Sequence, residues 1–386
     1  MKRIGIITMY HNSENYGGIA QGFALQKYIE NLGYDSEIIS YQHKKRKIIE
    51  KNLFAYILNH ANHIHVKIYI RLKSKIAKII LEKKIAPDLQ KRRDAFAKSR
   101  ELARHSKEYT DQTIKDCVGK YDVYVSGSDQ IWKPGIANDA YLFNFLPNDS
   151  HVISYASSTA VSEFDDDYDS FMKRSLQKYR WISVREENAQ NHFRTILSKE
   201  IDLVVDPTLL LGYEYWNAVA DDYQTNTKYI FAYFLGDSTK QRKIVKKIAK
   251  DYGLEIVTLP HLGKSPRLSD VSFANIDLYD VNLFQFLGLI KNSSLVVTDS
   301  FHAVVFSNMF QKSFLVFERE VVNKKDQMNG RLDTILGMFG ERNRKVSDYK
   351  SACNALKMEI DYEEVHEILR VAAKESGEKL QRALEV

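Results

Sequence analysis

The chain has 386 residues, of which 44% are hydrophobic and 12% aromatic, enough to bury two cores of about 150 to 200 residues each. Six prolines, seventeen glycines and two cysteines exclude a low-complexity chain and a disulfide framework. No uninterrupted apolar stretch approaches the roughly 20 residues that span a bilayer. Because the N-terminus also lacks the apolar core of a signal peptide, we expect a cytoplasmic protein.

The net charge of +6 comes from one region of the chain. Between Lys44 and Glu108, 19 Lys or Arg stand against 6 Asp or Glu, so the remainder is acidic. Isoleucine and leucine recur every four residues there, which predicts a basic amphipathic helix. Such a helix can lie on an anionic membrane surface, here the inner membrane face, or it can be a solvated excursion packed on the first domain. The region shows no nucleic-acid-binding module, so we expect no nucleic acid partner.

Apolar runs separated by helical spacings predict alternating strands and helices in the first half. Strands are expected at Arg3–Met9, Tyr34–Tyr41, Tyr121–Ser126, His151–Ser157, Trp181–Val184 and Leu203–Val205, and a first helix at about 19–32. The turn-rich HNSENYGG after the first strand contains no GxGxxG fingerprint. Its Asn15 and Gly17 are candidates for binding a phosphate or a sugar, although paired glycines can simply permit a tight turn.

Four successive strands of this half are followed at once by polar residues. The carboxyl ends of parallel strands meet at one edge of a sheet, so these residues predict a lined cleft. Asp129 could orient or deprotonate a sugar hydroxyl, or cap the next turn. Arg185 offers a fork of N–H donors to a carboxylate or phosphate, or pairs with Glu186. Asp206 precedes a proline, and we interpret it as a turn residue.

The second half repeats the alternation. Strands are predicted at Tyr229–Leu235, Glu255–Leu259, Leu295–Thr298 and Phe314–Phe317, and helices at Lys240–Tyr252, Asn282–Asn292, 301–310, Asn329–Leu336 and from Asp361 onward. The segment SLVVTDSFHAVVFSNMFQKSFLVFER reads as a strand, a helix and a parallel strand. Ser300 and His302 therefore lie where a helix N-terminus can hold an anion.

His302 is the candidate general acid or base, because its unperturbed pKa is close to working pH. A lone histidine at a helix start can also be a structural hydrogen-bonding group. Arg331 has a similar position at the start of its own helix, although a surface arginine is the competing interpretation. The chain has no HExxH, paired CxxC, Walker A or GxSxG motif, so we expect no metal and no organic cofactor.

Seven segments, in this order, resemble the polysaccharide pyruvyl transferase family. They are NYGGIAQGFALQKY from Asn15, VSGSDQIW from Val125, SYASS from Ser154, ISVREENA from Ile182, VVDPTLLL from Val204, TDSFHAVVFS from Thr298 and GRLDTIL from Gly330. The resemblance implies an α/β fold of two Rossmann-like domains facing a cleft, similar to glycosyltransferase B, with a basic helical insertion. We place the domains at residues 1–211, with the insertion at about 43–108, and 212–345. A helical tail at 346–386 would pack back on the first domain.

The resemblance also implies the donor and the site. It implies pyruvyl transfer from phosphoenolpyruvate to a saccharide diol, which forms a cyclic ketal in surface polysaccharide biosynthesis. His302 matches the family's active-site histidine, and Arg185 its anion-binding arginine. The family carries an arginine two residues before the histidine, where this chain has Ser300, so Arg331 or Lys312 is expected to replace it.

Two other functions fit the same pattern. A glycosyltransferase that uses a nucleotide sugar has the same architecture, and a non-catalytic saccharide- or anion-binding protein would bind without releasing phosphate. The acceptor sugar, and whether it is lipid-linked, are open at this point.

Overall fold

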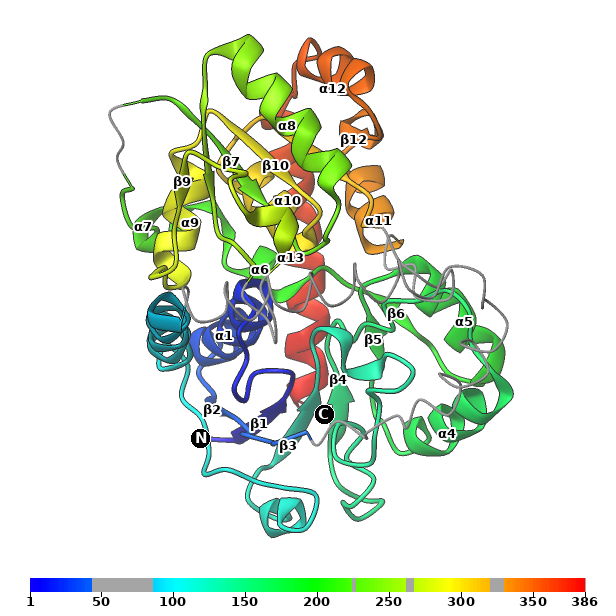
Figure 1. Cartoon of the computed structure of the whole chain (residues 1–386). Coiled ribbons are helices and arrows are strands. Elements are labelled where there is room, and N and C mark those ends of the chain that lie inside the picture. The colour runs from blue at the N-terminus through cyan, green and yellow to red at the C-terminus, as the bar shows by residue number, and fades with distance from the viewer. Residues whose placement is uncertain (44–85, 224–226, 262–266, 320–329, 386) are drawn as a thin grey trace, which may run out of the picture.

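Two parallel β-sheets organise the chain, and each is covered by helices (Figure 1). The computed structural model describes residues 1–43, 86–223, 227–261, 267–319 and 330–385. The predicted fold class is confirmed, because both sheets are parallel and the helices lie between successive strands. We refer to the parts built on the first and second sheet as the first and second half.

The first sheet has the order β2-β1-β3-β4, and all of its pairings are parallel. Its strands are β1 (Arg3–Ile7), β2 (Asp35–Ile38), β3 (Val123–Ser126) and β4 (Val152–Ser154). The residues of β3 and β4 are buried throughout, which explains why both strands read as continuous apolar runs. A short parallel pair, β5 (Ser183–Val184) and β6 (Asp202–Leu203), continues this half and is joined to it by isolated bridges.

The second sheet has the order β12-β11-β10-β7-β8-β9 and is also parallel. Its strands are β7 (Tyr229–Tyr233), β8 (Glu255–Thr258), β9 (Ile276–Asp277), β10 (Leu295–Thr298), β11 (Phe314–Phe317) and β12 (Lys345–Val346). The edge strands β9 and β12 have two residues each and were not predicted. Their brevity leaves little unpaired backbone at the sheet edges.

The helices are α1 (Tyr16–Asn31), α4 (Asp166–Leu176), α5 (Glu187–Ile196), α6 (Pro207–Leu210), α7 (Gly212–Val219), α8 (Thr239–Tyr252), α9 (Leu283–Lys291), α10 (Phe301–Met309), α11 (Gly330–Met338), α12 (Tyr349–Leu356) and α13 (Tyr362–Glu385). All nine residues of α10 are buried, as expected for a helix that is apolar on nearly every side. The strand β10, the helix α10 and the strand β11 form the predicted parallel crossover unit.

A shared apolar cluster joins the two halves. Tyr16, the first residue of α1, stacks on Phe286 of α9 with ring centroids 4.5 Å apart and nearly parallel planes. Its hydroxyl donates to the carbonyl of Val281 over 2.8 Å. Apolar residues of α1 and of β7, α9 and α10 belong to the same buried cluster, so the N-terminus of α1 is fixed against the second half.

The basic region is described only from residue 86, so the isoleucine-rich predicted helix lies outside the described residues. Residues 86–100 are helical. Within this helix, Arg92 donates to the carbonyls of Leu278 and Tyr279, and Ser99 Oγ accepts from the N–H of Leu283. This part of the region therefore packs on the second half as well, and its buried arginine serves a structural contact.

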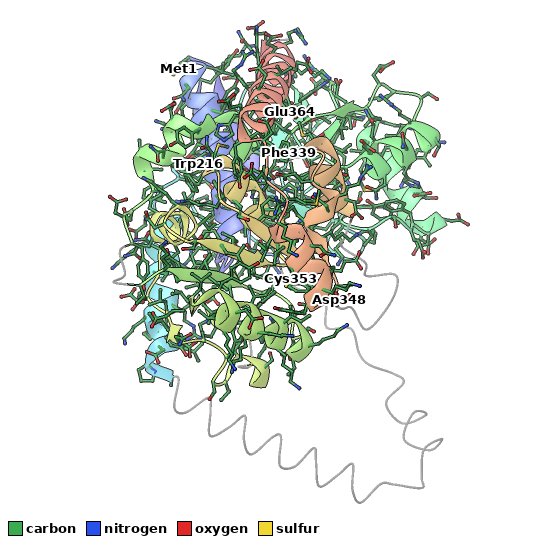
Figure 2. The ribbon with its side chains drawn as sticks, turned by 90° about the horizontal axis from the view of Figure 1, so that it is seen from above. Met1, Trp216, Phe339, Asp348, Cys353 and Glu364 are labelled. Atoms are coloured by element: carbon green, nitrogen blue, oxygen red, sulfur yellow. The ribbon has the colours of Figure 1, made fainter. Side chains whose placement is uncertain are left out.

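The C-terminal helix α13 runs past both halves (red in Figure 1) and contacts α6, α7 and α10. Near its end, the carbonyl of Ala383 lies 2.9 Å from His151 Nε2, and the carbonyl of Leu384 accepts from Lys2 Nζ. Figure 2 shows the side chains of α12 and α13 from above, with Asp348 and Glu364 labelled near their starts. The domain boundaries themselves stay a prediction. No described helix is long and apolar enough to cross a bilayer.

Candidate functional site

The predicted strand ends of both halves meet around His302. His302 is the second residue of α10, and only 6% of it is exposed. Its Nε2 lies 3.5 Å from Asp206 Oδ2 of the first half. Its Nδ1 faces α1, since a Cβ built on Gly17 would lie only 2.0 Å from that nitrogen. Gly17 is therefore required by the close approach of the imidazole, rather than by a tight turn.

Asp206 is the carboxylate that sequence reasoning left out. Its Oδ1 accepts from the N–H and the hydroxyl of Thr208, which caps α6 as expected for a turn residue. Its Oδ2 accepts from Arg185 Nη1 and faces His302. Burial alone would raise the pKa of Asp206, but His302 and Arg185 together hold it well below its usual range. Asp206 is thus an anion that orients the imidazole.

Arg185 is surrounded by carboxylates. Its Nη1 donates to Asp206, its Nη2 donates to Asp129 Oδ1 over 2.8 Å, and its Nε lies 3.7 Å from Glu186 Oε1. Burial would lower the pKa of Arg185, but these three carboxylates raise it above its usual range. The Phe301 ring covers the guanidinium at 5.1 Å. Two of its five N–H groups donate to carboxylates, and its Nε has no hydrogen-bond partner among the described residues. The anion-binding role of Arg185 stays a prediction.

Asp129 follows β3 with φ 68° and ψ −170°, a backbone conformation that is essentially restricted to glycine and costs about 1–3 kcal/mol. The carbonyl of Asp129 accepts from the N–H of Ser158, which fixes this conformation. Its carboxylate bonds Arg185 and lies 3.8 Å from Arg331 Nη1. Strain of this kind is typical of functional positions.

Arg331, in the first turn of α11, is less well paired. It is buried, and the Phe301 ring lies 5.9 Å from its guanidinium carbon. The Gln130 side-chain oxygen can accept from its Nη1 and Nη2 over 2.9 and 2.7 Å. Burial and the nearby Arg185 lower the pKa of Arg331 to about 10, so it remains a cation at neutral pH. An anion in the cleft would relieve this desolvated charge.

Two further arginines of the second half, Arg319 and Arg267, add to this positive charge. Arg319, after β11, lies 3.7 Å from Asp299 Oδ2 and close enough to contribute to the lowered pKa of Arg331. Arg267 donates to the carbonyl of Gly236 over 2.9 Å. Burial, together with Arg267, Arg92 and Arg319, lowers the pKa of His261 to about 4. Several guanidinium groups therefore gather at the carboxyl edge of the second sheet.

Three other predicted residues have different surroundings. Asn15 is the N-cap of α1, and its side chain accepts from the N–H of Gly18. Ser300 is the N-cap residue of α10, two residues before His302 in the sequence. Its side chain makes no capping hydrogen bond to the helix. Lys312 lies at the far end of α10, where burial and Lys291 lower its pKa. The structure does not bring Lys312 to the His302 cluster.

A cavity of about 600 Å³ lies between the two halves. Arg185, Glu186 and Asp206 line it from the first half, and Phe301 and Arg331 from the second, while Asp206 and Phe301 both contact His302. We name the first-half carboxylates Asp129, Glu186 and Asp206 the acidic wall. We name Arg267, Arg319 and Arg331 of the second half the basic wall, although only Arg331 of these three lines the cavity itself. No group of three or more metal-ligating side chains occurs among the described residues.

Residues 15–320 match the family model described as polysaccharide pyruvyl transferase, which covers most of the chain and all of the site segments except Arg331. The chain belongs to the polysaccharide pyruvyl transferase family. No curated protein matches the sequence. Membership supports an enzyme that modifies polysaccharides, and the segments that carry it contain the residues assembled above.

Solved structures give the fold of this family member. A UDP-N-acetylglucosamine 2-epimerase from Neisseria meningitidis bound to UDP-GlcNAc aligns with TM-score 0.53 and 10% identity, covering 100% of this chain and 99% of that one. The enzyme of the same name from Rickettsia bellii aligns with TM-score 0.53 and 10% identity, covering 100% and 96%. A glycosyltransferase from Rickettsia africae ESF-5 aligns with TM-score 0.50 and 10% identity, covering 100% and 98%. At such identities the likeness establishes the glycosyltransferase-B-like fold alone.

Sequence reasoning missed two carboxylates that line this cavity. Asp206 was assigned to a turn, and Glu186 was considered only as a partner of Arg185. The available signal was the position of both directly after predicted strands, which places them at the same sheet edge. Arg319 also follows a strand, but its electrostatic interaction with Arg331 is visible only in three dimensions.

Proposed function

We propose that this family member transfers the pyruvyl group of phosphoenolpyruvate to two hydroxyls of a saccharide, forming a cyclic ketal. One observation carries the proposal: the carboxylates Glu186 and Asp206 share a cavity with the cationic Arg331, and His302 lies 3.5 Å from Asp206. Phosphoenolpyruvate is an anion and suits guanidinium groups. A neutral diol suits carboxylates, which accept hydrogen bonds from hydroxyl groups.

In the proposed mechanism, Arg331 and Arg319 hold the carboxylate and phosphate of the donor. His302 protonates the methylene carbon, and the resulting oxocarbenium-like carbon is attacked by a saccharide hydroxyl. Asp206, 3.5 Å from Nε2, helps to orient the ring and stabilises the imidazolium. The arginines contribute positioning and charge stabilisation. No metal or organic cofactor takes part in these steps.

The acceptor belongs to the proposal as well. A saccharide used in surface polysaccharide biosynthesis can be lipid-linked, and the positive charge of residues 44–108 would then bring the enzyme to an anionic membrane surface. Most of that region lies outside the described residues, so membrane association stays a prediction. Binding to vesicles with and without anionic lipid, at two salt concentrations, checks it.

The test incubates the protein with phosphoenolpyruvate and a panel of glycans, and follows inorganic phosphate together with the mass of the saccharide product. His302→Ala should lower turnover about 1,000-fold while the thermal unfolding curve keeps its shape. The exposed His105→Ala is the matched control and should keep full turnover. Near-normal turnover in His302→Ala would rule out the proposed role.

A nucleotide-sugar-dependent enzyme is one rival function, because a structural neighbour of the same fold is bound to UDP-GlcNAc. Binding of a nucleotide diphosphate without binding of phosphoenolpyruvate would favour a nucleotide-sugar-dependent glycosyltransferase. Binding of saccharide and donor without phosphate release would favour a non-catalytic protein. Equilibrium titrations with both ligands therefore separate the two transferases before any acceptor has been identified, and the phosphate assay with the glycan panel identifies a non-catalytic protein.

A further inference from the structure

Glu186 stands apart among the carboxylates of the acidic wall. It is buried, and it lines the 600 Å³ cavity. Its Oε1 accepts from the hydroxyl of Ser158, whereas its Oε2 has no hydrogen-bond partner among the described residues. An unpartnered buried carboxylate oxygen costs free energy, so its retention beside a cavity points to a ligand that donates a hydrogen bond.

Asp129, the residue first assigned as a base, is worse suited to that task. Its Oδ1 lies between two guanidinium groups, 2.8 Å from Arg185 Nη2 and 3.8 Å from Arg331 Nη1. This oxygen already accepts a hydrogen bond from Arg185, whereas Glu186 Oε2 has no partner among the described residues. Asp129 is also absent from the residues that line the cavity.

Burial and the groups around Glu186 act on its pKa in opposite directions, and burial is the larger effect. Burial raises the pKa of Glu186, while Arg185, the Ser158 hydroxyl, Arg331 and the N–H of Thr159 oppose the rise. The remaining titratable group that interacts with it is Tyr168, whose own pKa burial keeps well above its usual value. A carboxyl group with a raised pKa exchanges protons more readily near neutral pH.

We propose that Glu186 is the general base that deprotonates the first saccharide hydroxyl, and that the first-half side of the cavity beside it is the acceptor pocket. This inference rests on the proposed function. The donors that Glu186 Oε2 lacks would be supplied by the acceptor, and the apolar lining formed by Val161, Val204 and Leu209 suits the faces of a sugar ring.

The atoms balance in the following way. The oxygen of the first hydroxyl bonds to C2 of phosphoenolpyruvate as its proton passes to Glu186, and C3 gains the proton of His302. The bond between C2 and the phosphate oxygen breaks, and the phosphate leaves with the proton that Glu186 received. The oxygen of the second hydroxyl then bonds to C2, and its proton returns to His302. Neither an oxidant nor a reductant is needed.

The experiment measures phosphate release, ketal mass and phosphoenolpyruvate affinity for Glu186→Gln, Asp129→Asn and the parent enzyme across pH. Glu186→Gln should lower kcat at least 100-fold, change the donor Kd less than threefold, and remove the acid limb of the kcat profile. Asp129→Asn should keep that limb. The exposed Glu200→Gln is the matched control for removal of a carboxylate.

Ser158→Ala keeps the inference testable if Glu186→Gln does not fold. Because the Ser158 hydroxyl lowers the pKa of Glu186, its removal should move the acid limb to higher pH. The inference about Glu186 is overturned if the parent is active and Glu186→Gln retains its kcat and its acid limb. It is also overturned if Ser158→Ala does not shift the acid limb. In both cases the proposed function itself stands. A parent that releases no phosphate with any glycan overturns the inference together with the proposed function.

Discussion

The two walls of the cleft carry opposite charge, and they are built differently. On the acidic wall, three carboxylates surround one arginine, Arg185, so the cation is neutralised and the wall keeps an excess of negative charge. On the basic wall, Arg267 and Arg319 donate to backbone carbonyls, and Arg331 lies 3.8 Å from its nearest carboxylate. Arg185 therefore organises the site, while the basic wall retains charge for a ligand.

This difference separates the tasks of the two halves. Carboxylates accept hydrogen bonds from hydroxyls and protons from them, so the first half suits the acceptor. Guanidinium groups bind carboxylate and phosphate, so the second half suits the donor. His302 comes from the second half but is oriented by Asp206 of the first, which places the proton transfer where the two substrates meet. Three variants, taken from the largest expected effect to the smallest, test this division.

Asp206→Asn should remove one of the three negative charges of the acidic wall. It leaves Arg185 with one strong partner and removes the anion beside His302, so we expect kcat to fall about 1,000-fold and the free energy of unfolding to drop by about 3 to 5 kcal/mol. Turnover and urea unfolding measure the two effects. The exposed Asp167→Asn, in the first turn of α4, should change neither.

The stabilisation that Asp206 contributes to the folded protein should decrease as the pH falls. The pKa of Asp206 is lower in the folded protein than in the unfolded chain, so its stabilisation is fully present above about pH 4. It is lost as pH falls toward the folded-state pKa. The difference in unfolding free energy between parent and Asp206→Asn should therefore shrink on acidification. A difference that stays constant from pH 7 to pH 3 would contradict the assigned charge.

Arg331→Lys tests the basic wall. Lysine keeps the charge but loses the planar fork, so the KM for phosphoenolpyruvate should rise about tenfold, or about 1.4 kcal/mol, with a smaller change in kcat. The KM for the saccharide should stay within twofold, because the acceptor is assigned to the other wall. Arg370→Lys, exposed on α13, is the control. Equal losses for donor and acceptor would remove the distinction between the walls.

Lys312→Ala should have the smallest effect, with kcat and both KM values within twofold of the parent. The side chain lies beyond the C-terminus of α10, beside Lys291, whereas His302 lies at the N-terminus. Steady-state kinetics with both substrates varied check this. A tenfold rise in the donor KM would restore Lys312 as the replacement for the arginine expected at Ser300.

Much of the fold was predictable because buried parallel strands read as apolar runs. The crossover from β10 through α10 to β11 was read from the sequence almost to the residue. The helix α4 was missed although Tyr168, Met172 and Leu176 recur every four residues on its buried face. Its acidic first turn masks the pattern, since most of its remaining residues are charged or polar.

The site was only partly predictable, because spacing gives position along a chain but not the partners across a cleft. His302 and Asp129 were chosen from their positions after strands, and they lie close to a common set of residues. Arg185 pairs with Asp206 and Asp129, which are distant in sequence, and no local pattern reveals this pairing. The distance of Lys312 could have been foreseen, since nine helical residues span about 14 Å.

The central claim of the proposed mechanism is that His302 delivers a proton to the methylene carbon of phosphoenolpyruvate. The most direct measurement runs the reaction in deuterium oxide and determines the label in the product by mass spectrometry and proton NMR. A ketal whose methyl group carries one solvent deuterium, formed by the parent and not by His302→Ala, is the predicted result. A product without the pyruvyl carbons, or a methyl group without solvent label, would contradict the account.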